Sequence, residues 1–212
     1  MKKLFNLALA FILATSSSIS LGYAGEKNEV KEIKNHVLSE STTTEKFIVT
    51  NNMLETNELT VPVTKKITQV DNNNYSVTTS TILYFDKETN QPLTVTPQTV
   101  GGYDSSYSVY ASVTSHYKKT GTFEVQYYAA EGYYTINDSS VKVWKQLVEC
   151  GHNAGFSTQK VTFNPTGTSF NYSTGFSPMS TILAVYGTRY TLTVGRSSAS
   201  STWSFTVADQ VN

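Results

Sequence analysis

The chain is poor in the residues that most often carry chemistry. Its 212 residues include one cysteine, Cys150, and three histidines, His36, His116 and His152. A single cysteine cannot form an internal disulfide, and so few sulfur and imidazole ligands make no zinc set. No glycine-rich phosphate-binding loop occurs either. The sequence therefore predicts no metal and no cofactor, and it gives no warrant for an enzyme.

Long hydrophobic runs are also missing, apart from one near the start of the chain. A basic beginning is followed by "LFNLALAFILA" (residues 4–14), which is shorter than the about 20 apolar residues that span a membrane. Gly22 and Ala24 then stand at the −3 and −1 positions of a cleavage site. These features predict a signal peptide over residues 1–24 and a secreted, extracellular protein. Export without disulfides favours a Gram-positive bacterium as the source.

Neither sign of charge dominates. The chain has 16 Lys and Arg against 16 Asp and Glu, and loss of residues 1–24 removes two of the lysines, which leaves a net charge near −2. No basic stripe is present to attract nucleic acid or an anionic membrane surface. We therefore expect no nucleic-acid partner, and no membrane contact except under the pore-forming alternative described below.

The charges that do occur are concentrated near the N-terminus. Residues 25–58 hold seven Glu and four Lys, and Val30, Ile33, Val37 and Leu38 lie at helical spacing. An isolated helix of this length is marginal in water, so we predict a charged, weakly helical segment. It could be a flexible tether, a docked helix or a pro-segment removed after export, and the first two are favoured.

What the chain has in abundance is the alternation typical of β-strands. In "SYSVYASVTSHY" (106–117) the odd positions are apolar, apart from a serine, and "TFEVQYY" (122–128) alternates in the same way. The intervening "KKTG" suits a turn, so the two runs predict a hairpin. Candidates for inward-facing positions are Val109, Val113, Phe123, Val125, Leu192, Val194, Trp203, Phe205 and Val207.

The same pattern recurs along the rest of the chain. "DNNN" (71–74), "PTGT" (165–168) and "RSSASS" (196–201) each separate two alternating runs. Residues 139–150 fit a strand or a helix, and we favour a strand because the neighbouring segments are strands. We therefore predict an all-β protein, with an antiparallel β-sandwich or partly closed barrel over residues 59–212 that follows the charged segment.

One turn has a superficial likeness to a calcium loop. "DKETN" (86–90) places oxygen-bearing side chains at alternate positions. Gln91 and Pro97, however, stand where such a loop has glycine and glutamate. We predict a polar hairpin turn here and no metal site.

The only candidate for nucleophilic catalysis lies in "LVECGHNAGFS" (147–157). A reactive thiol needs a lowered pKa and a base close to it in space. His152 and His116 are the bases available to Cys150, since His36 falls in the charged segment. Cysteine also behaves as a small buried hydrophobe, and that interpretation is favoured. A cysteine-dependent hydrolase is a weak alternative.

Aromatic residues are unusually common, with 14 Tyr, 10 Phe and 2 Trp. Adjacent tyrosines of an extended chain point to opposite faces, so one of Tyr127 and Tyr128, and one of Tyr133 and Tyr134, should face outward. Tyr110 also falls on the polar face of its strand. Exposed tyrosines can stack on sugars or anchor a protein partner. The candidate ligand-binding surface is formed by Tyr110, Tyr128, Tyr133 and Tyr134, although cross-strand packing of tyrosine with threonine, which stabilises any sheet, is the favoured interpretation of the pattern.

A pore-forming protein is the main alternative to a binding protein. A hairpin with one apolar face and one Ser/Thr face can become part of an oligomeric membrane barrel. Residues 106–128 are the candidate hairpin. Soluble β-sandwiches carry strands of the same kind, so the pattern alone does not favour insertion.

Several phrases of the sequence are similar to those of known proteins. "YDSSYSVYASVTSHY", "VTFNPTGTSFNYSTGF" and "SSTWSFTVAD", within residues 103–208, resemble segments of small secreted β-rich proteins of Gram-positive bacteria that are functionally uncharacterised. The resemblance covers about half of the chain and implies export and a β fold. It transfers no active-site residue.

These observations together favour a secreted, non-enzymatic protein. Its predicted partner is a surface polymer, such as a cell-wall component or a polysaccharide, or another protein. The pore-forming and cysteine-dependent alternatives remain open at this point.

Overall fold

The computed structural model describes residues 35–94, 106–182, 184–196 and 202–209. The predicted signal peptide and the beginning of the charged segment lie outside these ranges. The described residues contain strands and turns but no helix, and hence no helix long and apolar enough to cross a membrane.

Twelve strands account for most of the described residues. They are β1 (His36–Asn51), β2 (Thr56–Gln69), β3 (Asn74–Asp86), β4 (Pro92–Leu93), β5 (Ser106–Gly121), β6 (Glu124–Ile136), β7 (Lys142–Ala154), β8 (Ser157–Phe163), β9 (Ser169–Ser173), β10 (Met179–Ser180), β11 (Ala184–Gly195) and β12 (Thr202–Ala208). The strand β7 confirms the prediction of a strand within residues 139–150.

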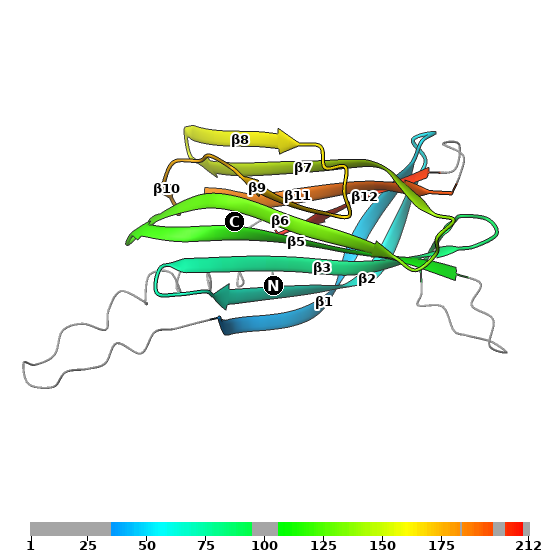
Figure 1. Ribbon diagram of the computed structural model, residues 1–212, viewed down its shortest axis with the longest axis horizontal. Helices are drawn as coiled ribbons and strands as arrows, with labels where there is room; N and C mark the ends of the chain where they lie inside the picture. The colour runs from blue at the N-terminus through cyan, green and yellow to red at the C-terminus, as the bar shows by residue number, and fades with distance from the viewer. Residues whose placement is uncertain (1–34, 95–105, 183, 197–201, 210–212) are drawn as a thin grey trace, which may run out of the picture.

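The strands form one antiparallel sheet in the order β10-β6-β5-β3-β2-β1-β12-β11-β7-β8, to which β4 adds beside β3 and β9 beside β6. The sheet folds over so that β3, β5 and β6 pack against β11 and β12 (Figure 1). The order ends at β10 and β8, so the sheet stays open. The predicted all-β, antiparallel, sandwich-like fold is confirmed.

The β1–β2 hairpin joins the two layers. Residues 63–69 of β2 pair with β3 in one layer, while Thr50 and Asn51 at the far end of β1 pair with β12 in the other. In Figure 1 the blue and cyan ribbon of this hairpin runs obliquely from beside β3 toward β12. Strand β1 is therefore an integral part of the sheet, which begins at His36 rather than near residue 59.

The prediction of a weakly helical segment is wrong for its described part, because residues 36–51 form β1 and Thr56 already belongs to β2. Val37 and Leu38, part of the proposed helical stripe, lie in β1. The run "STTTEKFIVT" (41–50) is rich in β-branched residues, which favour a pleated strand. Pairing along nearly the whole of β2 supplies hydrogen bonds that an isolated short helix would lack.

The two runs on either side of "PTGT" (165–168) also differ from the predicted hairpin. β8 pairs with β7 and β9 pairs with β6, so this segment carries the chain from one layer to the other. Phe170 of β9 explains the crossing, because its ring is buried over Gly132 of β6. The hairpins around "DNNN" and "RSSASS" are confirmed as β2–β3 and β11–β12.

The core lies between the layers and consists of the inward-facing positions of both. Eight of the nine inward candidates are buried there. Phe123 is the exception, with 54% of its surface exposed, because it lies in the two-residue turn between β5 and β6. Edge-to-face contacts of Tyr117 with Tyr186, at 5.2 Å between ring centroids, and of Phe170 with Tyr190, at 4.9 Å, join the layers.

Candidate functional site

Two of the four predicted tyrosines meet on the outer face of β5 and β6. Tyr110 lies on β5 and Tyr133 on β6, and their ring centroids are 5.6 Å apart with 39° between the ring planes. Tyr133 is 45% exposed and Tyr110 is half-buried. A hydrogen bond to Tyr110, followed by partial burial, raises the pKa of Tyr133. The pair forms a neutral aromatic surface with its hydroxyl groups in contact.

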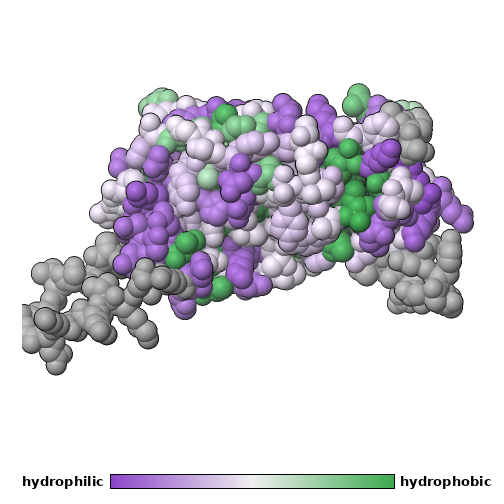
Figure 2. Space-filling view, viewed as in Figure 1, coloured by the Kyte–Doolittle hydropathy of each residue, from purple (hydrophilic) through white to green (hydrophobic). Residues whose placement is uncertain are grey.

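Most positions around this pair carry short or uncharged side chains, and the charged exception is Glu131, two positions before Tyr133 on the same face of β6. Thr135 pairs with Tyr110 across the strands, and Ser112 pairs with Tyr133. On the neighbouring strand β3, Ile82 lies opposite Tyr110. One row further along the face, the hydroxyl oxygens of Thr78 and Thr114 are 2.9 Å apart. Figure 2 shows the view across β3, β5 and β6, where pale side chains of intermediate hydropathy cover much of the middle.

Tyr84 is a third tyrosine on this face that the sequence prediction missed. It pairs with Ser108 on β5, one row beyond Tyr110, and is half-buried. The signal was present, because Tyr84 follows Ser76, Thr78 and Ser80 at the polar positions of the β3 alternation. Only the register between β3 and β5, however, places it beside Tyr110.

Tyr128 lies further along the same face, in a different environment. Its ring is 6.0 Å from that of His116, and the His116 Nε2 is 3.3 Å from the Glu131 carboxylate. A bulge lies here, because Tyr117 pairs with Tyr127 while His116 pairs with Ala129. Burial, with smaller contributions from nearby carboxylates, raises the pKa of Tyr128. His116 is thus engaged at the surface of the sheet.

Tyr134 faces the other way. It follows Tyr133 in the strand, and its half-buried ring packs against the hydrophobic core. Burial raises the pKa of its hydroxyl. The structure therefore brings Tyr110 and Tyr133 together, places Tyr128 at a distance along the same face, and separates Tyr134 from them.

The environment of Cys150 opposes nucleophilic catalysis. Its side chain is fully buried, and burial raises the pKa of the thiol to about 11. The groups hydrogen-bonded to it are Tyr127 and Thr188. A nucleophilic cysteine needs the opposite shift. The thiol therefore stays protonated at neutral pH.

Neither candidate base is arranged to serve that thiol. Burial lowers the pKa of His152, whose Nε2 lies 3.2 Å from the Ser180 carbonyl oxygen and whose ring centroid is 4.9 Å from that of Tyr186. His116 lies on the outer face of the other layer. His36, at the start of β1, is exposed.

A buried polar cluster around Thr188 was not foreseen from the sequence. The Ser115 and Thr188 hydroxyl oxygens are 2.6 Å apart, and the Tyr127 hydroxyl contacts both. The Thr188 N–H donates to Asp209 Oδ1 at 2.5 Å. Burial raises the pKa of Asp209 to about 7, although its hydrogen bonds act in the opposite direction. The available signal was Ser115 itself, the polar exception among the inward positions of its strand.

The turn at residues 86–90 is confirmed, and it also contributes to the core. Asp86 Oδ1 accepts hydrogen bonds from the backbone N–H of Glu88 at 3.0 Å and of Thr89 at 2.7 Å. Asn90 is buried, and its carbonyl oxygen accepts a hydrogen bond from Trp203 Nε1 at 2.7 Å. Within the described part of the chain, no group of three or more His, Cys, Asp or Glu side chains is placed to hold a metal ion.

Comparisons of the chain with protein-family models, with curated proteins and with solved structures found no match. The resemblance to secreted Gram-positive proteins therefore stays a prediction, and the case for function depends on the geometry of this chain alone.

Proposed function

We propose that this protein is a non-enzymatic extracellular binding protein that holds a neutral polysaccharide on the surface formed by Tyr110 and Tyr133. The observation that carries the proposal is the contact between these two rings on an outward face, with Tyr84 one row away. A pair of rings that completes no core packing is available for a ligand, and a tyrosine offers a stiff apolar ring with a polar end.

The surroundings favour a sugar over a charged ligand. The three cross-strand rows that contain Tyr84, Tyr110 and Tyr133 have no charged side chain on the outer face of β3, β5 and β6. Their other outward members are Ser80, Ile82, Ser108, Ser112 and Thr135. Serine and threonine hydroxyls both donate and accept hydrogen bonds, as the hydroxyls of a sugar require. The rings would stack on the apolar face of a sugar unit while hydroxyl groups bind its edge.

A polysaccharide also fits the size of the surface better than a protein partner does. Stable protein interfaces bury about 1,200–2,000 Å² in total and are centred on well-packed anchors. A single pair of contacting rings provides far fewer anchors than such an interface requires. A chain of repeated sugar units compensates for weak contacts by making several of them along the sheet.

Co-sedimentation tests the proposal. The protein, purified after export, is mixed in parallel with a neutral insoluble polysaccharide (cellulose or chitin), with purified Gram-positive cell wall and with liposomes. We expect binding to a polymer, and we expect the Tyr110→Ala/Tyr133→Ala variant to lose at least tenfold in affinity. Tyr133→Phe, which keeps the ring, should retain most of the binding.

Phe156→Ala is the matched control, since Phe156 is a fully exposed aromatic residue in the turn between β7 and β8. Its binding should equal that of the wild type. Equal binding by the double tyrosine variant and the wild type would overturn the proposal. Binding to liposomes with release of an enclosed dye would instead favour pore formation, which requires β5 to separate from β3.

A further inference from the structure

The outer face of the second layer carries two facing glycines. Gly151 of β7 pairs directly with Gly187 of β11, and on its other side it pairs with Lys160 of β8. Two successive positions of one cross-strand row therefore have no side chain. Above and below the row, Arg189 pairs with Glu149 and Val185 pairs with Asn153.

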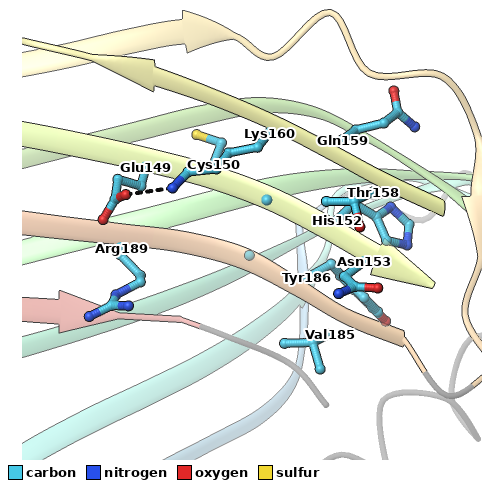
Figure 3. Close-up of a pocket in the computed structure, with 12 residues that line it drawn as sticks. Glu149, Cys150, His152, Asn153, Thr158, Gln159, Lys160, Val185, Tyr186 and Arg189 are labelled. Atoms are coloured by element: carbon cyan, nitrogen blue, oxygen red, sulfur yellow. Dashed lines mark hydrogen bonds and ion pairs between the residues drawn. The ribbon is translucent and has the colours of Figure 1, made fainter. Parts of the chain in front are cut away.

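The missing side chains leave a hollow of about 360 Å³ in this face. Its lining residues include the two glycines and the side chains around them (Figure 3). Cys150, His152 and Tyr186 also line it, but their side chains are buried on the core side, so they contribute backbone to the floor. A hollow of this size falls at the lower end of the range for small-molecule sites, about 300–1,000 Å³.

The fold explains one of the two glycines and not the other. Gly187 has a φ of 138°, which side-chain-bearing residues rarely adopt. Gly151 is not among the residues with positive φ, and a Cβ atom built on it meets nothing within 4 Å. Glycine within a strand weakens it by roughly 0.5–1 kcal/mol relative to alanine. A glycine within a strand often marks a bulge, a tight bend or a place where a ligand or another backbone approaches closely, and the strand register at Gly151 is regular on both sides.

The rim of the hollow carries an excess of positive charge. Lys160 Nζ lies 2.9 Å from Glu149 Oε1, so these two charges offset each other (Figure 3). Arg189 is exposed, and no ion pair with another described residue involves it. A guanidinium group binds a carboxylate through two parallel hydrogen bonds. The charge that remains available at the rim is therefore suited to a single carboxylate.

The remaining lining residues suit the rest of a sugar ring. Asn153 and Thr158 provide hydrogen-bonding groups on the side away from Arg189, while Val185 supplies an apolar contact. Gln159 pairs with His152, and its side-chain amide is bonded to the Ser177 backbone, so it does not face the hollow. The partly exposed backbone of Gly151 lets a flat ring approach this part of the floor, whereas Gly187 beside it is buried. A ligand with one carboxylate, several hydroxyls and an apolar ring face matches all of these features.

We propose that the hollow over Gly151 and Gly187 binds a carboxylate-bearing sugar, such as a uronic acid unit, with Arg189 holding the carboxylate and Asn153 and Thr158 binding hydroxyl groups. This site lies on the opposite face of the sandwich from Tyr110 and Tyr133 and does not depend on them. The protein thus has two sugar sites of different chemistry, one for neutral and one for acidic units.

Isothermal titration calorimetry with trigalacturonic acid, and with its methyl ester as the uncharged counterpart, tests the proposal. The protein purified after export should bind the acid at least tenfold more tightly than the ester. Arg189→Gln should remove that preference. Gly151→Val should abolish binding of both by filling the hollow, and its melting temperature should match that of the wild type because the added methyl groups enter open space.

Two controls separate this site from the rest of the molecule. Lys66→Gln removes a charge from β2 in the other layer and should leave the affinity unchanged. The Tyr110→Ala/Tyr133→Ala variant should also bind trigalacturonic acid with wild-type affinity. The proposal for the hollow can therefore be tested even if Tyr110 and Tyr133 bind no polysaccharide. Equal affinity for acid and ester, undiminished binding by Arg189→Gln, or no binding by the wild type would each overturn the proposal.

Discussion

On the outer face of β3, β5 and β6 two tyrosines stand side by side, whereas on the outer face of β7, β8 and β11 two glycines do. The first pair raises an aromatic surface above the sheet. The second opens a hollow that reaches the backbone. The charge differs as well, because the rows of the tyrosine pair are uncharged, while Glu149, Lys160 and Arg189 surround the glycine pair.

The tyrosine pair and the glycine pair both lie among cross-strand pairs of serine and threonine side chains. Cross-strand pairs of hydroxyl side chains cover the two faces, with Thr78 and Thr114 at 2.9 Å on one, and Thr191 and Thr206 at 2.8 Å on the other. Such pairs stabilise a sheet wherever they occur, so they say little about ligands. The specific information lies in the positions that depart from the background, where the side chain is either much larger or absent.

The largest expected effect comes from a glycine that faces the core. A Cβ atom on Gly132 would lie 2.6 Å from Phe170 Cζ and 2.7 Å from the backbone oxygen of Ser112. Gly132→Ala should therefore destabilise the protein by about 2–3 kcal/mol through overpacking. Gly151→Ala should be neutral or stabilising by about 0.5 kcal/mol. Urea denaturation of the two variants measures both values.

A similar loss of stability in Gly132→Ala and Gly151→Ala would contradict the expected difference between the two glycines. It would mean that Gly151 is required by the fold, so that its glycine would no longer indicate a ligand. Gly121→Ala, in the β5–β6 hairpin, provides an intermediate case, because its Cβ would lie 3.2 Å from Glu124 Cβ, so that the hairpin would have to shift by a few tenths of an ångström.

The next effect concerns the core that the two faces share. The pKa of Asp209 is about 7 in the folded protein against about 3.9 in an unfolded chain. The folded state therefore retains a proton between these values that the unfolded state has released. The contribution of this group to stability is full below about pH 4, declines as the pH rises toward 7, and is then constant.

The Asp209→Asn variant isolates this contribution, since other carboxyl groups titrate equally in both proteins. The stability of the wild type relative to the variant should fall by about 2–3 kcal/mol between about pH 5 and about pH 8. Chemical denaturation at the two pH values gives the difference. A constant difference would show that Asp209 does not carry a raised pKa. Because the cluster lies between the layers, ligand binding on either outer face should keep the same pH profile in the variant.

A smaller effect separates the ligands of the two faces. Raising the salt concentration from about 0.1 M to about 1 M shortens the screening length from about 10 Å to about 3 Å. Binding of trigalacturonic acid at Arg189 should weaken severalfold, and binding of a neutral polysaccharide at Tyr110 and Tyr133 should stay constant. Calorimetry and co-sedimentation at both salt concentrations would show this. Equal salt dependence of the two would mean that the faces do not differ in charge preference.

The strand pattern could be predicted from the sequence because alternation is a local property. Val109 and Val113 must share a face with each other in any extended chain. Two predictions failed where a non-local contact decided the structure. The N-terminal residues around Val37 became a strand because β2 was available to pair with them, and the segment around Phe170 left β8 because Gly132 offered room for its ring.

The candidate site was partly predictable for the same reason. Tyr110 falls on the polar side of its own alternation, and Tyr133 and Tyr134 must point in opposite directions. Which of the last two faces outward depends on the register with β5, which the sequence does not specify. The hollow could not be foreseen at all, because Gly151 and Gly187 become neighbours only through the pairing of β7 with β11.

The smallest expected effect concerns the cross-strand hydroxyl pairs that occur on both outer faces. Double-mutant cycles with valine, which keeps the shape of threonine and removes its hydroxyl, measure the coupling within each hydroxyl pair. We expect about 0.2–0.5 kcal/mol for Thr78 with Thr114 and a similar value for Thr191 with Thr206, because each pair is only partly buried and the oxygen–oxygen distances are nearly equal. None of these variants should change sugar binding. A coupling well above 1 kcal/mol on one face only, or loss of binding there, would mean that its hydroxyl pairs are tied to the site and that the two faces differ in more than their central residues.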